Sequence, residues 1–586
     1  MLRARVPVRA WFVLIVLSGG LLAAAARAVY VTTKLGPRLF PVLARQRGTR
    51  EPIPAPLGDI VDRHGRLLAT CQPVYSLYVN PRALPADQIE TVLRPIADAL
   101  RLPLDGIVRR VRRRQDRYFV WLKRRLSEAE LSKLVALQLD PRWFGFRREY
   151  RRVYPKGRLA AHVLGFRDID LRPHGGIEQA FDHLLRGTPG ERYVLRDAAG
   201  RPVHVDQTRH RRPEPGDTIQ LTIDAVIQYF AEEALREVAQ QWRPRGGMAC
   251  VVLDPHTGEV LALASWPVFD PNTPAHAPPE AWLNRAIGAV YEPGSTFKPF
   301  IAAAALNWGV VSLEEPIDCH NGVYRMGRRV LHSDHPHGVL PFAEVLIRSD
   351  NIGMAVIGER LGLEGVYRAV ELFGFGRPTG IELPGEVRGK VQPFHLWNYY
   401  SLGSVPMGHE VGVTPLQLLR AFAALANGGY LLKPTVIKRV LRCDGQVRLE
   451  HEGAVVERRV VRAEVTTLLK DVLRRVVEER YGTGRRAQLP DYTLFGKTGT
   501  AQKPDPRGGG YLRGRHVSSF VVGAPVHAPE VVAYLLVDDP AGPGHHYGGQ
   551  VAAPAAAHLI QRTLRYLGVP PDKAAETART EPNRRR

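Results

Sequence analysis

Residues 291–306 read Tyr-Glu-Pro-Gly-Ser-Thr-Phe-Lys-Pro-Phe-Ile-Ala-Ala-Ala-Ala-Leu, a short polar turn followed directly by an apolar run. Gly294 permits a tight turn, and Ser295 is a residue type that caps helices well. Pro299 fits the first turn of a helix, where its missing N–H is not needed. Because the apolar residues continue to Leu306, this stretch predicts a helix that begins at the turn, with Ser295 as its N-cap.

Apolar strands are predicted on both sides of this helix along the chain. Residues 248–253 and 260–264 are apolar, and Pro255-His256-Thr257-Gly258 between them is a good hairpin turn. Further strand-like runs follow at 492–495, 517–522 and 531–537. Since strands occur early and late in this segment with helices between them, the sequence predicts an α+β domain whose sheet joins both ends of the segment.

Two more helices belong to the same segment. Apolar residues recur with helical period from Thr222 to Val238. A later helix has clear end signals, with Thr414 as N-cap, Pro415 at the first position and Gly428 beyond the end.

The chain is long and basic. Its 586 residues exceed what one hydrophobic core usually supports, so at least two domains are expected. Lys and Arg total 81 against 58 Asp and Glu, a formal net charge of +23. Such a charge favours acidic partners, namely nucleic acid, anionic lipid or a polyanionic wall, and composition alone does not choose among them.

The N-terminus predicts export. An apolar run at 11–26 resumes after Arg27 at 28–31, and it is preceded by Arg3, Arg5 and Arg9. The first run is slightly short of the roughly 20 residues that span a bilayer, but Arg27 at the outer interface would let the next turn complete the span. The preceding basic residues place the N-terminus in the cytoplasm and the remainder outside. A cleaved signal peptide is the alternative, because Ala26-Arg27-Ala28 resembles a cleavage site.

A basic segment at 107–125 is interleaved with aromatic residues, Tyr118, Phe119 and Trp121. A nucleic-acid surface has this pattern, but so does a solvated helix face followed by an apolar strand. Because the segment is exported, we favour the second interpretation and expect no nucleic-acid partner.

The cysteines and histidines indicate no metal site. Cys71, Cys250, Cys319 and Cys443 form no C-x-x-C pair, and their spacing identifies no disulfide. Ligand-type residues do cluster after Cys319 and His320, at His332, Asp334, His335 and His337. Their spacing fits no standard zinc pattern, so a polar loop near a groove is favoured over a metal site. His545-His546-Tyr547 is likewise interpreted as a loop.

The first motif with catalytic chemistry is Ser295-x-x-Lys298. Residues three apart share a helix face, so the Lys298 amine can reach the Ser295 hydroxyl. A serine hydroxyl needs a base to become a nucleophile, and a desolvated lysine can serve. Backbone N–H groups at a helix start also favour developing negative charge. Alone, the motif is weak and an ordinary cap explains it.

The second motif, Ser349-Asp350-Asn351, opens an apolar helix predicted at 352–361. Simple N-capping explains these residue types, since all of them cap well. In a catalytic interpretation, Ser349 passes a proton between Lys298 and the leaving or attacking amine, and Asn351 holds a substrate amide.

The third motif, Lys497-Thr498-Gly499-Thr500, lies within a strand pattern. Gly499 weakens a strand unless another backbone approaches closely, as a peptide laid along the sheet edge would. Lys497 and Thr498 would bind a carboxylate, and the N–H groups of Thr500 and Ser295 would form an oxyanion hole. An exposed polar strand end is the alternative for this motif alone.

Together and in this order, the motifs are much less probable by chance than any one of them. Over roughly residues 50 to 565 the chain resembles a class B penicillin-binding protein. The other segments that carry the resemblance are Asp62-Arg63-x-Gly65 with Leu68-Ala69, His162-x-x-Gly165, Gly176-Ile177-Glu178, Leu221-Thr222-Ile223-Asp224, Gly258-Glu259-Val260-Leu261-Ala262, Val413-Thr414-Pro415-Leu416-Gln417 and Tyr547-Gly548-Gly549. Length and Tyr291-Glu292-Pro293-Gly294-Ser295 resemble the septal type more than the elongation type. Two departures are Leu57, where the family usually has Arg, and Met407-Gly408-His409-Glu410.

The resemblance implies an α+β transpeptidase domain, in which helices flank an antiparallel sheet and a helical subdomain is added. This domain is expected to follow an elongated pedestal domain of mixed α and β structure, which in turn follows one N-terminal transmembrane helix. The expected division is a cytoplasmic basic tail at 1–10, an anchor at 11–31, a pedestal (dimerisation-type) domain at 40–215, the transpeptidase domain at 216–568 and a basic disordered tail at 569–586. The implied location is the cell membrane, with the catalytic domain extracytoplasmic.

The resemblance also implies a mechanism. Ser295 attacks the penultimate D-Ala of a stem pentapeptide, Lys298 takes its proton, and an amine of a neighbouring stem peptide resolves the acyl-enzyme. The implied catalytic residues are Ser295, Lys298, Ser349, Asn351 and Lys497, with Thr498, Gly499 and Thr500 binding substrate. β-Lactams would trap the serine, no metal or cofactor is needed, and the expected partners are a membrane glycosyltransferase and division or elongation proteins.

Three other functions remain open from the sequence. A β-lactamase or penicillin-sensing receptor shares two of the motifs, but a β-lactamase needs no long exported region before its nucleophile. A D,D-carboxypeptidase differs only in using water as the acceptor. A catalytically silent scaffold would have no use for Lys298 and Lys497 together.

Overall fold

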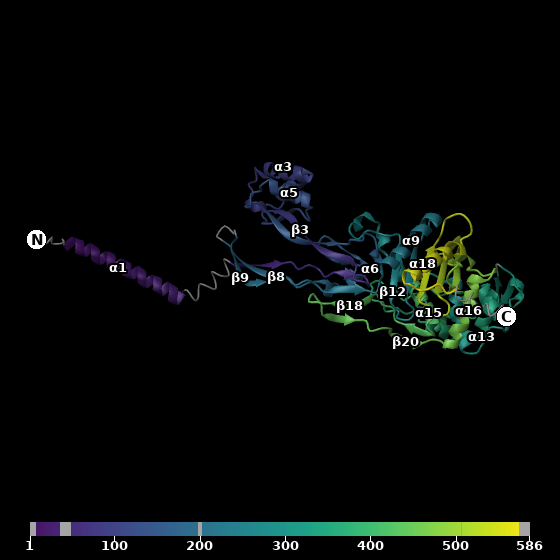
Figure 1. Ribbon diagram of the computed structural model, residues 1–586. Helices are drawn as coiled ribbons and strands as arrows, with labels where there is room; N and C mark the ends of the chain where they lie inside the picture. Colours follow the sequence, from purple (N-terminus) through teal and green to yellow (C-terminus); the bar gives the residue numbers. More distant parts are fainter. Residues whose placement is uncertain (1–7, 36–47, 197–201, 334, 506, 574–586) are drawn as a thin grey trace, which may run out of the picture. The chain divides into compact units, whose positions relative to one another are not determined.

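The computed structural model describes residues 8–35, 48–196, 202–333, 335–505 and 507–573, whose helices and strands are drawn in Figure 1. The chain divides into two compact units, Met1–Pro56 with Gly187–Pro215, and Leu57–Arg186 with Gly216–Arg586. The first seven residues of the predicted N-terminal tail, residues 574–586 of the C-terminal tail and Asp334 lie outside the described residues.

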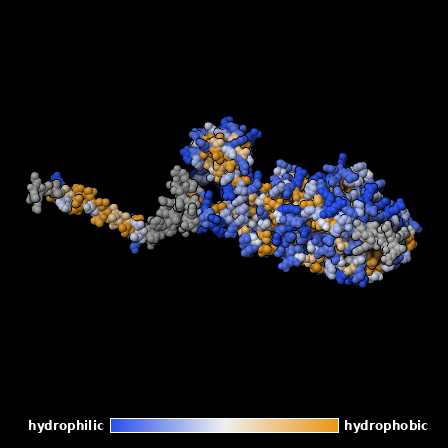
Figure 2. Space-filling view, viewed as in Figure 1, coloured by the Kyte–Doolittle hydropathy of each residue, from blue (hydrophilic) through white to orange (hydrophobic). Residues whose placement is uncertain are grey.

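The first unit contains an isolated apolar helix and a small sheet. Helix α1 (Val8–Tyr30), followed by a π-helical turn at Val31–Leu35, buries none of its residues, and Figure 2 shows apolar residues along its length. Its 23 residues extend about 35 Å, enough to cross the hydrocarbon core of a bilayer. No other described helix is long and apolar enough to do so. The sheet has the order β1 (Gly48–Ile53), β8 (Gly190–Arg196), β9 (Pro202–Arg211).

The core of the second unit is a five-stranded antiparallel sheet in the order β12-β11-β23-β22-β21. Its strands are β11 (Gly247–Leu253), β12 (Val260–Trp266), β21 (Phe495–Pro504), β22 (Tyr511–Ala524) and β23 (Val531–Asp538). Two strands precede the helices and three follow them, so the prediction that the sheet joins both ends is confirmed. The predicted strand at 492–495 is placed too early, because Tyr492 and Thr493 instead hydrogen-bond Val569 and Asp572 after the last helix.

Helices cover both faces of this sheet, which explains why its central strands are apolar throughout. Met248, Cys250 and Val252 belong to one core, and the alternating Ala249, Val251 and Leu253 to the other. The first core includes α9 (Ala225–Trp242) and α18 (Ala553–Tyr566). The second includes α11 (Lys298–Asn307), α15 (Pro415–Ala426) and most of the buried face of α16 (Ala463–Glu478).

The predicted end signals of α15 are confirmed. The Thr414 hydroxyl accepts the Gln417 N–H while the Gln417 side chain accepts the Thr414 N–H, a capping box, and Gly428 beyond the end has φ +85°.

The helical part of the unit lies between β12 and β21 in sequence. Helix α12 (Phe342–Ile347) is followed by α13 (Asn351–Leu372), which continues past the predicted end through a kink at Gly362. Three two-stranded antiparallel sheets pair β13 (Pro316–Asp318) with β16 (Val339–Pro341), β14 (Val323–Met326) with β15 (Arg329–His332), and β17 (Tyr430–Leu432) with β20 (Val456–Arg459).

A second sheet carries the N-terminal part of this unit. Its order is β19-β18-β10-β2-β3-β4, with β5 also paired to β3. The strands are β2 (Ile60–Val61), β3 (Leu67–Val79), β4 (Val120–Lys123), β5 (Phe144–Val153), β10 (Thr218–Leu221), β18 (Ile437–Leu441) and β19 (Val447–Glu450). A turn at 62–65 joins β2 to β3, and in it the Asp62 carboxylate accepts hydrogen bonds from the N–H groups of His64 and Arg66.

Three helices pack at the β3–β4 end of that sheet, α3 (Ile89–Leu100), α4 (Leu104–Arg112) and α5 (Glu128–Ala136). The basic segment at 107–125 begins on α4, where Ile107, Val108 and Val111 face the core and the arginines are exposed. It ends on β4, so the interpretation as a solvated helix face followed by a strand fits the structure.

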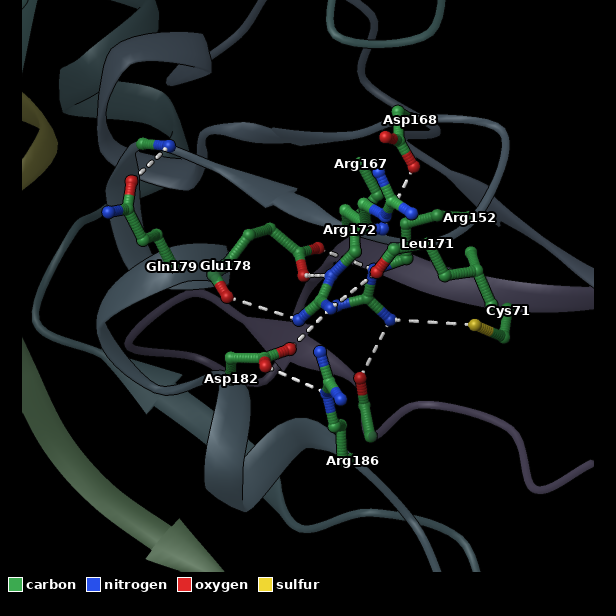
Figure 3. A network of polar contacts seen from close by, with 12 residues as sticks. Cys71, Arg152, Arg167, Asp168, Leu171, Arg172, Glu178, Gln179, Asp182 and Arg186 are labelled. Atoms are coloured by element: carbon green, nitrogen blue, oxygen red, sulfur yellow. Dashed lines mark hydrogen bonds and ion pairs between the residues drawn. The ribbon is translucent and has the colours of Figure 1, made fainter. Parts of the chain in front are cut away.

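A buried ion network joins the short elements that follow β5 (Figure 3). Glu178 lies in α7 (Gly176–Ala180), and Arg167 lies in β6 (Phe166–Arg167). The Glu178 carboxylate accepts hydrogen bonds from the Nε–H groups of Arg152 and Arg167, each at 2.5 Å. Arg167 also pairs with Asp182 of α8 (Asp182–Leu185), and Arg152 donates to the Gly58 carbonyl at 2.7 Å. The side chains of Glu178, Arg152 and Arg167 are at most 1% exposed, which accounts for Glu178 in the Gly176-Ile177-Glu178 motif.

Candidate active site

Ser295 lies in a 3₁₀ turn, Gly294–Phe297, directly ahead of α11. Its side chain caps no helix, so the predicted N-cap role is wrong: a 3₁₀ turn forms ahead of α11, and in the described parts of the chain the hydroxyl has no hydrogen-bond partner. Ser295 is half-buried, whereas Thr296 and Lys298 are fully buried. The turn therefore presents one hydroxyl and hides its neighbours.

Two glycines hold this turn against a second segment. Gly294 has φ +55° and Gly408 has φ +84°, a region that favours glycine. A Cβ on Gly408 would lie 2.1 Å from the Gly294 carbonyl oxygen, and the Gly294 N–H donates to the Gly408 carbonyl at 3.1 Å. The Met407-Gly408-His409-Glu410 segment is thus part of the support of the nucleophile turn.

Lys298 is 0% exposed and its amine contacts the second motif. Nζ donates to the Ser349 carbonyl at 2.6 Å and to Asn351 Oδ1 at 2.7 Å, and lies 3.2 Å from Ser349 Oγ. Burial disfavours the charged ammonium and lowers the pKa of Lys298 from 10.5 to about 7, against an opposing effect of the Asp350 carboxylate. Among the described residues, no hydrogen bond joins this amine to the Ser295 hydroxyl.

Lys497 reaches the same hydroxyl from β21. Its Nζ donates to Ser349 Oγ at 2.8 Å, and the residue is 0% exposed. Burial, and next the nearby Lys298, hold the pKa of Lys497 well below its usual value. The Ser349 hydroxyl therefore lies between two amines whose charged forms are both disfavoured.

The second motif is held by backbone geometry and by His337, which belongs to the loop that the sequence placed near a groove; His335 and His337 of this loop do line the cleft. Ser349 has φ +62°, an unusual conformation for a residue with a side chain. Asp350, not Ser349, is the N-cap of α13 and accepts the Gly353 N–H at 2.9 Å. Its other carboxylate oxygen lies 3.0 Å from His337 Nδ1. The loop that contains His337 is therefore linked to the N-cap of α13 through this contact.

The third motif lies on the edge strand β21, next to the nucleophile turn. A Cβ on Gly499 would lie 2.5 Å from Ser519 Oγ of β22, and from the nucleophile turn 2.8 Å from Thr296 Cγ2 and 2.9 Å from the Pro293 carbonyl oxygen. The backbone that requires this glycine is therefore that of the nucleophile turn, and not only an incoming peptide as the sequence suggests. Thr500 Oγ1 accepts the Gly548 N–H at 3.0 Å.

These segments enclose a cleft of about 600 Å³. Five of the predicted site residues line it, namely Ser295, Ser349, Asn351, Thr498 and Thr500. Lys298 and Lys497 lie buried beneath them. Asp350 of the second motif also lines it. The lining residues that the three motifs do not include are Ser333, His335, His337, Arg348, Gly482, Thr483, Arg485, Arg486, Tyr547, Gly549 and Gln550. Apart from the Tyr547-Gly548-Gly549 segment and the histidine loop, no sequence pattern pointed to them.

The cleft has the groups for acyl transfer: a free hydroxyl, amines with lowered pKa and an open sheet edge. In the part of the chain that the structure describes, no three His, Cys, Asp or Glu side chains are grouped so as to hold a metal ion.

Comparison with known families covers most of the chain. The family model for the penicillin binding protein transpeptidase domain matches residues 248–561. The model for the penicillin-binding protein dimerisation domain matches residues 52–169 and 173–221.

Individual proteins agree with this match. The chain is 32% identical to the probable peptidoglycan D,D-transpeptidase PenA of Neisseria meningitidis, over 90% of this chain and 87% of that protein. It is 29% identical to the peptidoglycan D,D-transpeptidase FtsI of Escherichia coli, over 88% of this chain and 84% of that one. Among solved structures, penicillin-binding protein 3 of Mycobacterium tuberculosis complexed with aztreonam superimposes with a TM-score of 0.68 at 27% identity, covering 89% of this chain and 98% of the other.

Proposed function

Since this chain belongs to the class B penicillin-binding proteins, which are serine-type peptidoglycan D,D-transpeptidases, we propose that Ser295 attacks the penultimate D-Ala carbonyl of a stem pentapeptide. The bond to the terminal D-Ala breaks, and an amine of a neighbouring stem peptide takes the acyl group to form the cross-link. One observation carries this assignment: the Ser349 hydroxyl contacts both Lys298 and Lys497 at the base of the cleft that Ser295 lines.

Lys298 is the base in this proposal. A neutral amine has two N–H donors and one lone pair, and Nζ has two short contacts to acceptors, at 2.6 and 2.7 Å. Donating to these leaves the lone pair for a hydroxyl proton. Because burial lowers the pKa of Lys298 to about 7, a large fraction of the amine is neutral at physiological pH.

The other motif residues complete the reaction. Ser349 passes the proton from Lys298 towards the leaving amine, and the chain of contacts from Lys298 through Ser349 to Lys497 provides the path. Lys497 and Thr498 bind the terminal carboxylate, and Asn351 holds a substrate amide. The backbone N–H groups of Ser295 and Thr500 stabilise the oxyanion. β-Lactams acylate the same serine.

Purified full-length protein, given a pentapeptide donor and an amine acceptor, is expected to release D-Ala and to form cross-linked dimer. Treatment with penicillin is expected to add one drug mass to the peptide that contains Ser295, and Ser295→Ala is expected to abolish the adduct. Hydrolysed tetrapeptide without dimer would indicate a carboxypeptidase. Absence of any adduct, or an adduct that persists in Ser295→Ala, would indicate the scaffold function.

We also propose a place in the cell. The apolar helix α1 is consistent with a single-pass membrane anchor, and the basic residues before it favour a catalytic domain outside the cytoplasm. We assign the enzyme to septal synthesis, beside a membrane glycosyltransferase of the shape-elongation-division-sporulation type. Depletion in the native host is expected to give long cells that fail to divide, whereas rounded cells would assign the enzyme to elongation.

A further inference from the structure

One wall of the cleft is cationic. Three arginines line this wall. Arg348 directly precedes the Ser349 motif, and Arg485 and Arg486 lie in the connection ahead of β21. Asp350 is the one carboxylate among the described lining residues, and its side chain is 0% exposed. Its two oxygens already bind the Gly353 N–H and His337. Among its described lining residues, the cleft therefore has exposed positive charge and no exposed carboxylate.

The three arginines differ in their partners. Arg348 pairs with Glu344 at 3.0 Å and lies over the Tyr481 ring, 3.9 Å from its centroid. Arg485 and Arg486 are exposed, and neither forms an ion pair with a carboxylate in the described parts of the chain. Two guanidinium groups at the substrate cleft therefore have no counter-ion among the residues that the structure describes.

The turn that carries these two arginines is well anchored. It is a 3₁₀ turn, Arg485–Ala487, in the connection between α16 and β21. The Gly484 N–H donates to the Val476 carbonyl of α16 at 3.0 Å, and Ala487 is fully buried.

The same connection is tied to the third motif. Thr483 and Thr498 share a hydrogen bond of 2.8 Å between their hydroxyl oxygens. The positions of Arg485 and Arg486 are therefore fixed relative to the strand along which the substrate lies, so that little ordering of the backbone is needed when a ligand binds.

We propose that Arg485 and Arg486 bind a second carboxylate of the donor stem peptide, carried by a residue ahead of the terminal D-Ala-D-Ala. This inference rests on the proposed function, in which Lys497 and Thr498 take the terminal carboxylate. Guanidinium groups bind carboxylates through paired, charge-assisted hydrogen bonds, which a lysine or an amide does not reproduce. The enzyme is thereby selective for stem peptides that keep a free side-chain carboxylate, such as those with a diamino diacid, over amidated or lysine-containing ones.

The test uses two cephalosporins with the same nucleus, one with a side chain that ends in a carboxylate and one with the matching primary amide. For full-length protein at low salt, the second-order rate constant of Ser295 acylation is expected to be about tenfold higher for the carboxylate. The double variant Arg485→Gln/Arg486→Gln is expected to bring the ratio close to one. The ratio in the unmodified protein is also expected to fall as salt is added, since exposed charges are screened.

Arg480→Gln is the matched control. Arg480 is exposed, lies on the same connection and does not line the cleft, so the variant removes the same charge and should keep the tenfold ratio. Equal rates for the two compounds in the unmodified protein, or a ratio that survives in the double variant, would overturn the inference. A ratio lost equally in Arg480→Gln would do so too, since it would indicate only the general positive field. Failure of the proposed function has a different signature, because then neither compound would acylate Ser295.

Discussion

Lys298→Met is expected to lower the rate constant for Ser295 acylation by about 10²- to 10⁴-fold, the contribution that a positioned general base makes. Methionine keeps a similar length and fits the buried site, but it has no basic nitrogen to take the serine proton. The measurement is time-resolved labelling with fluorescent penicillin, and Ser295→Ala gives the background signal without acylation.

Lys470→Met is the matched control for this variant. Burial also lowers the pKa of Lys470, but that residue lies on α16 and does not line the cleft. Its replacement is expected to leave acylation unchanged. Near-normal acylation in Lys298→Met, with the protein still folded, would assign the base to another group, and Lys497 would be the next candidate.

The pH dependence of acylation tests independently whether Lys298 is the general base. Burial lowers the pKa of Lys298 to about 7, so the amine is protonated in more acidic solution and has no lone pair to accept a proton. Acylation is therefore expected to rise as pH rises through about 7 and then to level off, with roughly a tenfold loss for each pH unit below the pKa. Lys298→Met should lack this step. A flat profile in the unmodified protein would contradict the role of Lys298.

Glu178→Gln is expected to lower the free energy of unfolding by about 3–5 kcal/mol. The substitution removes the carboxylate that Arg152 and Arg167 share, and their side chains are at most 1% exposed. Arg167 keeps its pair with Asp182, but Arg152 is left as a buried cation without a carboxylate partner among the described residues, close to a second guanidinium group. Urea unfolding of the detergent-solubilised chain measures the change.

Two comparison variants separate this cause from a general loss of packing. Glu90→Gln removes a carboxylate from an exposed pair with Arg94, and should cost at most about 1 kcal/mol. The triple variant Arg152→Met/Arg167→Met/Glu178→Leu removes all three charges together and should recover much of the loss. A change below about 1 kcal/mol in Glu178→Gln would show that water reaches the network and screens it.

Much of the fold was predictable because its signals are local. The capping residues of α15, the hairpin between β11 and β12 and the helical period of α9 each depend on neighbours a few residues apart. The early and late strands also predicted that one sheet joins both ends of the segment. The motifs predicted which residue types carry the chemistry.

Some local interpretations were wrong for tertiary reasons. Serine is a residue type that often caps helices, but Ser295 does not cap one. The segment around Gly408 packs against this part of the chain, and Ser295 lies in a 3₁₀ turn. For Gly499 the sequence suggests a peptide as the approaching backbone, and the structure adds the nucleophile turn, whose Pro293 carbonyl oxygen would lie 2.9 Å from a Cβ at this position. The Glu178 motif gave no indication that its partners are Arg152 and Arg167.

By itself the sequence determined many of the elements, the apolar N-terminal helix and the set of reactive groups, because spacing along one helix or strand fixes which side chains share a face. Only the tertiary structure decided which distant groups meet. The lowered pKa of Lys298 requires burial by residues far along the chain. The contact of Ser349 with two amines requires the start of α11, the residues just ahead of α13 and β21 to meet. The same holds for Arg485 and Arg486, which are ordinary surface arginines in the sequence and become part of a cleft only through packing.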